Sequence, residues 1–239
     1  KIAGSAPYIV GVGRTEKSLQ TALDLGVIDS AQTNISDAIE GADLILIAAP
    51  VAQTKAILQS IQPHLGADTV ITDAGSTKGD VLKVAREVLG AQFSQFVGGH
   101  PIAGAEKSGV VAAKSDLFLG KNVVLTPESF TNDALKTNIH AVRRASELWR
   151  ACGANVSEMP AETHDSIFAA VSHLPHLLAF ALVDDIASRP NAQQLFSFAA
   201  SGFRDFTRIA GSHPEMWRDI SLANRTALLN ELDAYQNEL

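Results

Sequence analysis

Hydrophobic and polar positions follow two different patterns along this chain, and the change lies near residue 160. Before it, short apolar runs are separated by segments with apolar residues at helical spacing. The runs predict strands at 8–12, 42–50, 69–75, 96–97, 121–126 and 154–159, and the spacing predicts helices at 16–26, 36–41, 51–65, 78–89 and 133–150. This alternation predicts a doubly wound parallel α/β sheet with right-handed crossovers.

After Pro160 the sequence predicts no strand. Long helical stretches follow at 161–188, 191–201 and 214–238, and 167–171 and 177–182 are apolar on more than one helical face. A helix that is apolar all round is buried between partners. We therefore expect two domains, residues 1–159 and 160–239, with the second all-helical and packed against another copy of the chain.

Composition narrows the possible partners. Of the 239 residues, 46% are hydrophobic and 19% charged, which is typical of a soluble globular protein. A net charge of −7 without a basic run excludes nucleic acid as the expected partner. The single cysteine, Cys152, fits a reducing cytoplasm. We expect no membrane segment, because no apolar run reaches spanning length and no leader opens the chain.

The glycine-rich segment 98–109 holds the most informative side chains. It contains His100, Glu106 and Lys107, and it directly follows the predicted strand Phe96–Val97. Open α/β sheets bind ligands at the carboxyl ends of their strands. The segment therefore predicts a ligand site in which the His100 imidazole is the chemical group, although a histidine in such a turn is more often structural.

Two other segments are predicted to reach the same edge of the sheet. Ala49 and Pro50 end the strand at 42–50 and leave room for a flat ligand, although proline also starts helices. Ser76 and Thr77 follow the strand at 69–75 and open a helix, where amides and hydroxyls face the sheet edge. A plain helix N-cap is compatible with ligand contact there.

The first strand also ends in a candidate binding segment, Gly13-Arg14-Thr15. A dinucleotide fold places an acidic residue here for the ribose of NAD, whereas an arginine can accommodate the 2′-phosphate of NADP. Arg14 and Thr15 are therefore candidate cofactor-binding residues. The alternative for Arg14 is a solvated surface side chain.

In the helical part, His173 and His176 lie three residues apart on one helical face, with Pro175 between them. The proline should kink the helix, and two imidazoles in an apolar segment indicate a polar cavity. Their spacing with His164 matches no metal motif, so we predict no metal. Arg208 would suit a bidentate clamp on a substrate carboxylate. Trp217 either walls a pocket or fills the core.

Together these segments resemble the prephenate/arogenate dehydrogenase family of tyrosine biosynthesis, over nearly the whole chain. The resemblance is carried, in order, by residues 27–29, 73–78, 99–109, 172–176 and 202–219. It implies oxidative decarboxylation of prephenate or arogenate with NAD or NADP. It also implies a Rossmann-type dinucleotide-binding domain followed by a helical dimerisation domain, and hence a homodimer.

The resemblance implies roles for single residues. His100 would accept the proton of the substrate's ring 4-hydroxyl while hydride leaves the same carbon, and Ser76 would hold that hydroxyl in line. Glu106 would belong to a gate beside the substrate pocket. The implied substrate-binding side chains are His173 or His176, and Arg208, which would grip a carboxylate.

The chain departs from the family pattern in two places. The family's first strand and its Gly-x-Gly-x-x-Gly turn are absent, since Gly11 and Gly13 lie on the next strand. Ala105 replaces a hydroxyl-bearing residue, which leaves prephenate and arogenate both open; Arg14 favours NADP over NAD.

Two other functions fit parts of the pattern. One is a dehydrogenase of small hydroxy acids, which typically uses a lysine on the interdomain helix; residues 161–188 contain none. The other is a non-catalytic protein that keeps the fold without the pyrophosphate-binding turn.

Overall fold

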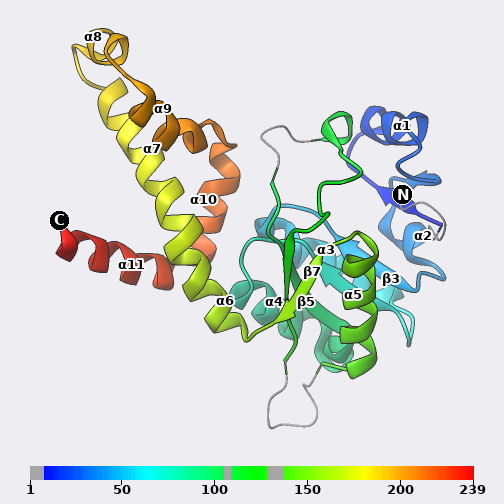
Figure 1. Cartoon of the computed structure of the whole chain (residues 1–239). Coiled ribbons are helices and arrows are strands. Elements are labelled where there is room, and N and C mark those ends of the chain that lie inside the picture. The colour runs from blue at the N-terminus through cyan, green and yellow to red at the C-terminus, as the bar shows by residue number, and fades with distance from the viewer. Residues whose placement is uncertain (1–7, 105–108, 129–136) are drawn as a thin grey trace. The chain divides into compact units, whose positions relative to one another are not determined.

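The computed structural model describes residues 8–104, 109–128 and 137–239 (Figure 1). The chain forms two compact units, Lys1–Ala161 and Glu162–Leu239. Each unit is described by itself.

The strands of the first unit form two sheets. β1 (Val10–Val12) pairs with β2 (Ser30–Gln32) in parallel. The other sheet has the order β3-β4-β5-β6-β7, with bounds Leu44–Ile47, Val70–Asp73, Phe96–Pro101, Asn122–Thr126 and Asn155–Glu158. Its pairs are parallel except for β5 and β6, which are antiparallel. The Rossmann-type α/β fold is thus confirmed, with one antiparallel pair.

Three local features of these strands differ from the sequence predictions. β2 was not predicted, because Ser30 and Gln32 leave it no apolar run. β5 continues through Gly98–Pro101, which the glycine content had indicated as loop. The apolar run of β3 was expected to be buried on both faces. Among the described residues, however, β3 pairs with β4 alone in the five-stranded sheet, and Leu46 remains 41% exposed.

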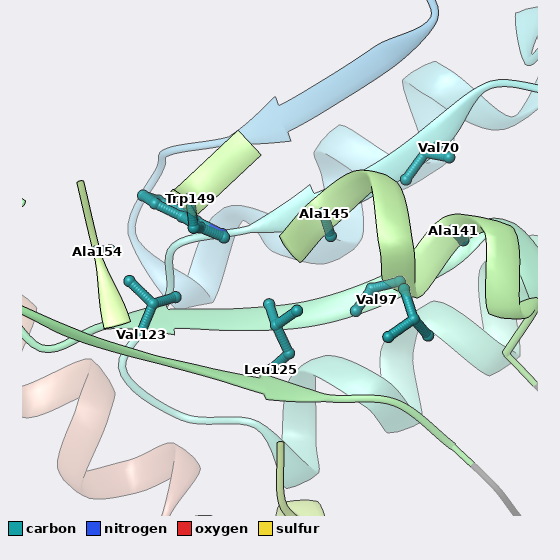
Figure 2. Packing of buried hydrophobic residues seen from close by; sticks show 9 residues of the cluster. Val70, Val97, Val123, Leu125, Ala141, Ala145, Trp149 and Ala154 are labelled. Carbon is teal, nitrogen blue, oxygen red and sulfur yellow. The ribbon is translucent and has the colours of Figure 1, made fainter. Parts of the chain in front are cut away.

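Helices α1 to α5 complete this unit, at Glu16–Asp24, Ile35–Ile39, Thr54–Ile61, Gly79–Leu89 and Ile139–Ala151. Helix α5 presents Ala141, Ala145 and Trp149 to the sheet, where they pack on Val97 and Leu125 (Figure 2). The small alanines let the helix approach the strands closely. The prediction started this helix at 133. Residues 133–136 lie outside the described part, and the helix begins at Ile139 because the Asn138 side chain accepts the amide of His140 at 2.9 Å.

The second unit is all-helical over its described length, as predicted. α6 (Ala161–Phe168) continues through a π-helical turn (Ala169–His173) into α7 (Leu174–Ala187). The turn ends two residues before Pro175, which lacks the N–H of a regular α-helical bond, so the predicted irregularity takes this form. The remaining helices are α8 to α11, at Ala192–Ser197, Ser201–Thr207, Pro214–Ala223 and Arg225–Glu238. The predicted helix 214–238 is interrupted at Asn224, and α9 was not predicted.

The helical stretch Ala161–Ala187 is 27 residues long and apolar enough to cross a membrane by length and composition. This one helix does not contradict the expectation of no membrane segment, because polar residues such as Asp165, His173 and His176 interrupt its apolar residues. Only 28% of its most apolar window is buried within this chain, and Val171 is 67% exposed. The faces of this helix present apolar surface that the chain alone does not cover.

Candidate active site

Four of the predicted site residues follow neighbouring parallel strands of the first unit. Ala49 and Pro50 follow β3, Ser76 follows β4, and His100 lies at the carboxyl end of β5. Because parallel strands end at one edge of a sheet, the topology brings these residues to the same edge. Pro50 is exposed, whereas Ala49, Ser76 and His100 are half-buried.

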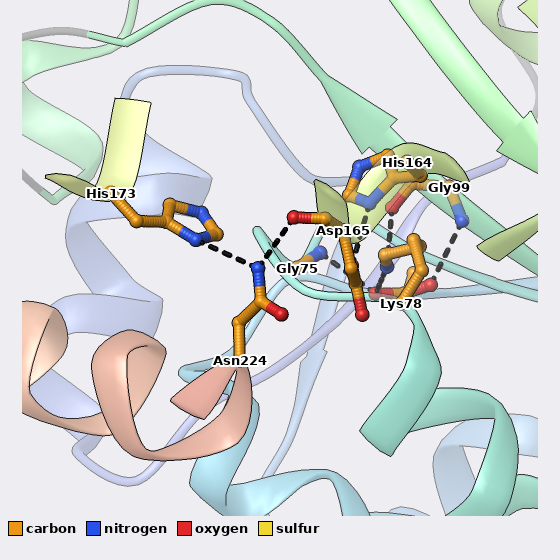
Figure 3. Close-up of polar contacts among 8 residues, drawn as sticks. Gly75, Lys78, Gly99, His164, Asp165, His173 and Asn224 are labelled. Carbon is orange, nitrogen blue, oxygen red and sulfur yellow. Dashed lines mark hydrogen bonds and ion pairs between the residues drawn. The ribbon is translucent and has the colours of Figure 1, made fainter. Parts of the chain in front are cut away.

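A buried ion pair, which the sequence analysis had not assigned a role, lies at the same edge (Figure 3). The Lys78 ammonium donates to the Asp73 carboxylate, and their side chains are 0% and 3% exposed. Both residues also bond to the backbone of Gly99, directly before His100. The signal in the sequence was a pair of opposite charges bracketing the turn between a buried strand and a helix.

The two glycines before His100 are required by close contacts. A Cβ atom at Gly99 would lie 2.6 Å from the Asp73 carbonyl oxygen, and one at Gly98 would lie 2.4 Å from Oγ1 of Thr126. A side chain at Gly99 would require a shift of the backbone, and one at Gly98 would require the Thr126 side chain to move. The glycines therefore serve the packing of β5 against its neighbours, one residue before the imidazole.

The candidate cofactor residues Arg14 and Thr15 follow β1 in the other sheet, and both are exposed. Oγ1 of Thr15 accepts the amide of Ser18 at 3.3 Å and caps α1, so the structure shows a structural task for this residue. No carboxylate occupies the end of β1, since Gly13 stands there and a Cβ would meet Leu19 at 3.2 Å. Arg14 is the first charged side chain after this strand.

Three predicted residues of the helical unit form one aromatic cluster. The His176 ring stacks on Trp217 with centroids 3.5 Å apart, and His173 meets the same indole edge-on at 6.2 Å. Arg208, which is exposed, lies close enough to His176 to lower its pKa. Trp217 therefore supports the imidazoles and is only partly buried.

Asn224 fixes the tautomer of His173 (Figure 3). The Asn224 amide nitrogen donates to the backbone oxygen of Asp165 at 2.7 Å, and a carbonyl only accepts, so this orientation of the amide is determined. The same nitrogen lies 3.1 Å from Nδ1 of His173. Nδ1 is thus an acceptor, and the hydrogen of the neutral ring resides on Nε2, a buried atom that has no hydrogen-bond partner among the described residues.

His176 has the opposite tautomer. Its Nδ1 lies 2.9 Å from the backbone oxygen of Ser172, so Nδ1 carries the hydrogen and Nε2 is left as an acceptor. Burial lowers the pKa of His176, the bond to Ser172 opposes this shift, and Arg208 adds to the lowering. The Nε2 atoms of the two rings therefore differ: that of His173 is a donor and that of His176 is an acceptor.

The pKa of His173 is lowered to about 4, mainly because burial disfavours the charged ring; Asp165 raises it, and His164 and His176 lower it. Between pH 6.5 and 4 the unfolded chain binds a proton at this ring that the folded protein does not. The free energy of unfolding should therefore fall by about 3 kcal/mol as the pH drops through this window.

Urea unfolding of the wild type and of His173→Gln at pH 7 and pH 4.5 tests this expectation. The variant should lose less stability on acidification than the wild type. His213→Gln, which changes an exposed histidine of the same unit, is the matched control and should keep the wild-type loss. An equal loss in His173→Gln and wild type would show that His173 does not cause it.

Glu106 lies outside the described residues. Among the residues described, no group of three His, Cys, Asp or Glu side chains is arranged to hold a metal ion.

The sheet edge fits a nicotinamide dinucleotide in part. Small residues at the end of β3 leave room for a flat ring, and the exposed Arg14 side chain follows β1. The glycine-rich turn that would hold the pyrophosphate has no counterpart in the ranges 8–104, 109–128 and 137–239.

Comparison with known proteins is consistent across both units. Residues 1–158 match the family described as prephenate dehydrogenase, nucleotide-binding domain, and residues 160–239 match its dimerization domain. A prephenate dehydrogenase of Bacillus subtilis is 40% identical over 234 residues, which are 97% of this chain and 61% of that protein. A cyclohexadienyl dehydrogenase of Zymomonas mobilis is 34% identical over 91% of this chain and 72% of its own length.

Solved structures agree. Prephenate dehydrogenase of Aquifex aeolicus, in complex with hydroxyphenyl propionate and NAD+, matches with a TM-score of 0.88 at 38% identity, over 98% of this chain and 80% of that one. A Synechocystis arogenate dehydrogenase matches with a TM-score of 0.78 at 26% identity, over 97% and 80%.

Proposed function

This chain belongs to the prephenate dehydrogenase family, and we propose on that basis that it oxidises and decarboxylates prephenate with a nicotinamide cofactor. The chain spans 61% of the length of the Bacillus subtilis relative, so the activity is proposed for the protein that contains it. The observation that carries the proposal is that His100 lies at the carboxyl end of β5 and Ser76 follows the neighbouring strand β4, in a fold shared with a relative whose structure contains NAD+.

The bound nicotinamide would accept the hydride that leaves the ring carbon bearing the hydroxyl. His100 takes the hydroxyl proton at a neutral imidazole nitrogen, which is general-base catalysis. The ring carboxylate then leaves as CO2, and its bonding electrons complete the aromatic ring. His100 returns the proton to the phenolate oxygen, so no net proton is released.

The other predicted residues bind and orient the substrate in this proposal. Ser76 holds the ring hydroxyl in line with His100, and Arg208 binds a substrate carboxylate through two parallel N–H donors. The Nε2–H of His173 and the Nε2 of His176 offer the donor and acceptor described above, while Trp217 keeps His176 in place. Glu106 remains a proposed gate residue.

Steady-state assays test the proposal directly. Prephenate and arogenate are each combined with NAD and NADP, and both the reduced nicotinamide and the phenolic product are measured. We expect turnover with prephenate. Arogenate is the second candidate substrate, because relatives named for cyclohexadienyl and arogenate dehydrogenation align over nearly the whole chain. Absence of turnover in all four combinations would overturn the proposed function.

NADP is the cofactor that the end of β1 favours. Arg14 can bind the 2′-phosphate, and no carboxylate is present at Gly13 to accept the ribose hydroxyls of NAD. Arg14→Gln should raise KM for NADP about tenfold, as expected for loss of an exposed charge-assisted contact, and leave KM for NAD unchanged. Parallel titrations of NADP and NAD give KM for each cofactor in the wild type and in the variant.

Arg143→Gln, which changes an exposed arginine on α5, serves as the control for this variant and should alter neither constant. A wild-type protein that uses NAD far better than NADP would contradict the assignment of Arg14.

We also propose that the helical unit pairs with a second copy of the chain. The match to a family dimerization domain and the uncovered apolar faces of the stretch Ala161–Ala187 support this pairing. Exposed apolar side chains also lie elsewhere in this unit: Phe198 follows α8, and Phe206, Leu222 and Leu229 lie on α9, α10 and α11. Sedimentation velocity at micromolar concentration tests it, and a monomer under those conditions would contradict it.

A further inference from the structure

Backbone pairing between β4 and β5 ends before the carboxyl end of β5. Beyond that point, side chains hold this strand on the β4 side. The ladder between these strands pairs Ile71 with Phe96 and Thr72 with Val97, and no further pair follows. β5 nevertheless continues to Pro101, paired on its other side with β6. The backbone groups of this extension that face β4 therefore need other partners.

Gly99 finds those partners in the ion pair of Asp73 and Lys78. Its N–H donates to Oδ1 of Asp73 at 2.9 Å, and its carbonyl accepts from Nζ of Lys78 at 2.8 Å (Figure 3). Oδ2 of Asp73 accepts from the same ammonium and from the amide of Gly75 at 2.8 Å. One ion pair thus replaces two ladder bonds and also fixes the turn after β4.

The residues on either side of Gly99 fit this arrangement. Backbone bonds to β6 alternate along the strand, and the amide of Ile102 donates to Asn122 at 2.8 Å. The backbone groups of His100 are therefore directed at β6, whereas those of its neighbours Gly99 and Pro101 are directed at the β4 side. Pro101 has no N–H to satisfy on the side where the ladder is missing.

Stability alone does not account for this pair. Taking two charges out of water costs several kcal/mol for each ion, and a buried ion pair is often matched or exceeded in stability by apolar residues. Asp73 and Lys78 are 2% and 0% exposed. What the pair supplies and an apolar pair cannot is directed bonding to both backbone groups of Gly99, which fixes the position of the next residue.

We infer that Asp73 and Lys78 are positioning residues that hold His100 in register for proton transfer. The inference rests on the proposed function, because it assigns the pair a task in that reaction. Catalysis of this kind depends steeply on geometry, and a misplacement of about 1 Å can cost about 10²-fold in rate. Neither residue needs to touch the substrate.

The test compares wild type, Lys78→Met and the neutral double variant Asp73→Asn/Lys78→Met. The double variant avoids leaving an unpaired buried carboxylate, which would destabilise the fold. We expect kcat to fall about tenfold in both, with KM for prephenate within twofold of wild type. Lys55→Met is the matched control: it breaks the exposed pair with Glu87 in the same unit and should leave kcat unchanged.

A double-mutant cycle separates positioning from general structural damage. If Lys78 acts through His100, then Lys78→Met should cost nothing further in a His100→Asn background. Full additivity, or kcat within twofold of wild type in both variants of the pair, would overturn the inference while the proposed function stands.

Hydrogen exchange of the Gly99 amide gives a readout that does not depend on activity. Exchange at Gly99 should be faster in both variants of the pair, and unchanged in Lys55→Met. Unchanged protection of the Gly99 amide in the pair variants would refute the inference that Asp73 and Lys78 hold Gly99 in place. This result would count even if the protein proved inactive. Absence of dehydrogenase activity in the wild type would instead refute the proposed function.

Discussion

Replacing His100 with asparagine is expected to lower kcat by about 10²- to 10⁴-fold, the usual contribution of a positioned general base. Asparagine is close to histidine in size and polarity, but its amide cannot take up a proton near neutral pH. Substrate and cofactor contacts made by other residues remain, so KM should change little. Steady-state kinetics with prephenate over a range of pH measures both effects.

The pH profile gives this experiment its second readout. A base must be unprotonated to act, so kcat/KM of the wild type should fall on the acid side, and this limb should be lost in His100→Asn. His140→Asn, a change at an exposed histidine on α5, is the control and should keep both the rate and the limb. Wild-type turnover in His100→Asn would remove the residue from the mechanism.

The sequence predicted those parts of the fold that local patterns determine. The apolar runs at β3 and β4 and the amphipathic spacing of α4 were found close to their predicted positions, because burial imposes a period on consecutive residues. Strand β2 has no such period: three residues, Ser30 to Gln32, are held by pairing with β1. Its existence depends on a partner that the sequence does not show.

The direction of β6 also depended on information that was not local. A parallel connection normally crosses over through a helix. Between β5 and β6 the described residues include only a short 3-10 helix, Val110–Ala112, and the strand returns antiparallel. The glycines at 98 and 99 indicated a loop, yet both lie in β5, since their missing side chains admit Asp73 and Thr126.

The sequence pointed to those residues of the candidate site that lie in recognisable local motifs. His100, Ser76, His173, His176 and Trp217 were singled out from residue type and place in the chain, but the stacking of the two histidines on Trp217 was not predicted. Asn224 was not singled out, because it acts on His173 across 51 positions of sequence and resembles an ordinary polar residue between two helices. Long-range hydrogen bonds of this kind leave no periodic signal.

Arg208→Gln is expected to raise KM for prephenate between about ten- and hundredfold, with a much smaller change in kcat. Hydrogen bonds to a charged group are worth about 1.5–3 kcal/mol, and glutamine keeps polarity without the charge or the paired donors. Such a contact is made equally in the ground and transition states, so its loss appears in KM. Arg208→Lys should recover part of the loss, because an ammonium restores charge without the planar fork.

The control for this variant is Arg189→Gln, which breaks an exposed ion pair with Asp185 at the end of α7 in the same unit. Exposed ion pairs contribute little to stability, so this variant should fold like the wild type. Its KM should therefore be unchanged. A specific contact between the guanidinium and a substrate carboxylate predicts one further result: a substrate analogue without that carboxylate should bind wild type and Arg208→Gln equally well. If the analogue still distinguishes the two proteins, Arg208 acts on the shape of the cluster around His176 and Trp217, and its role as carboxylate ligand is wrong.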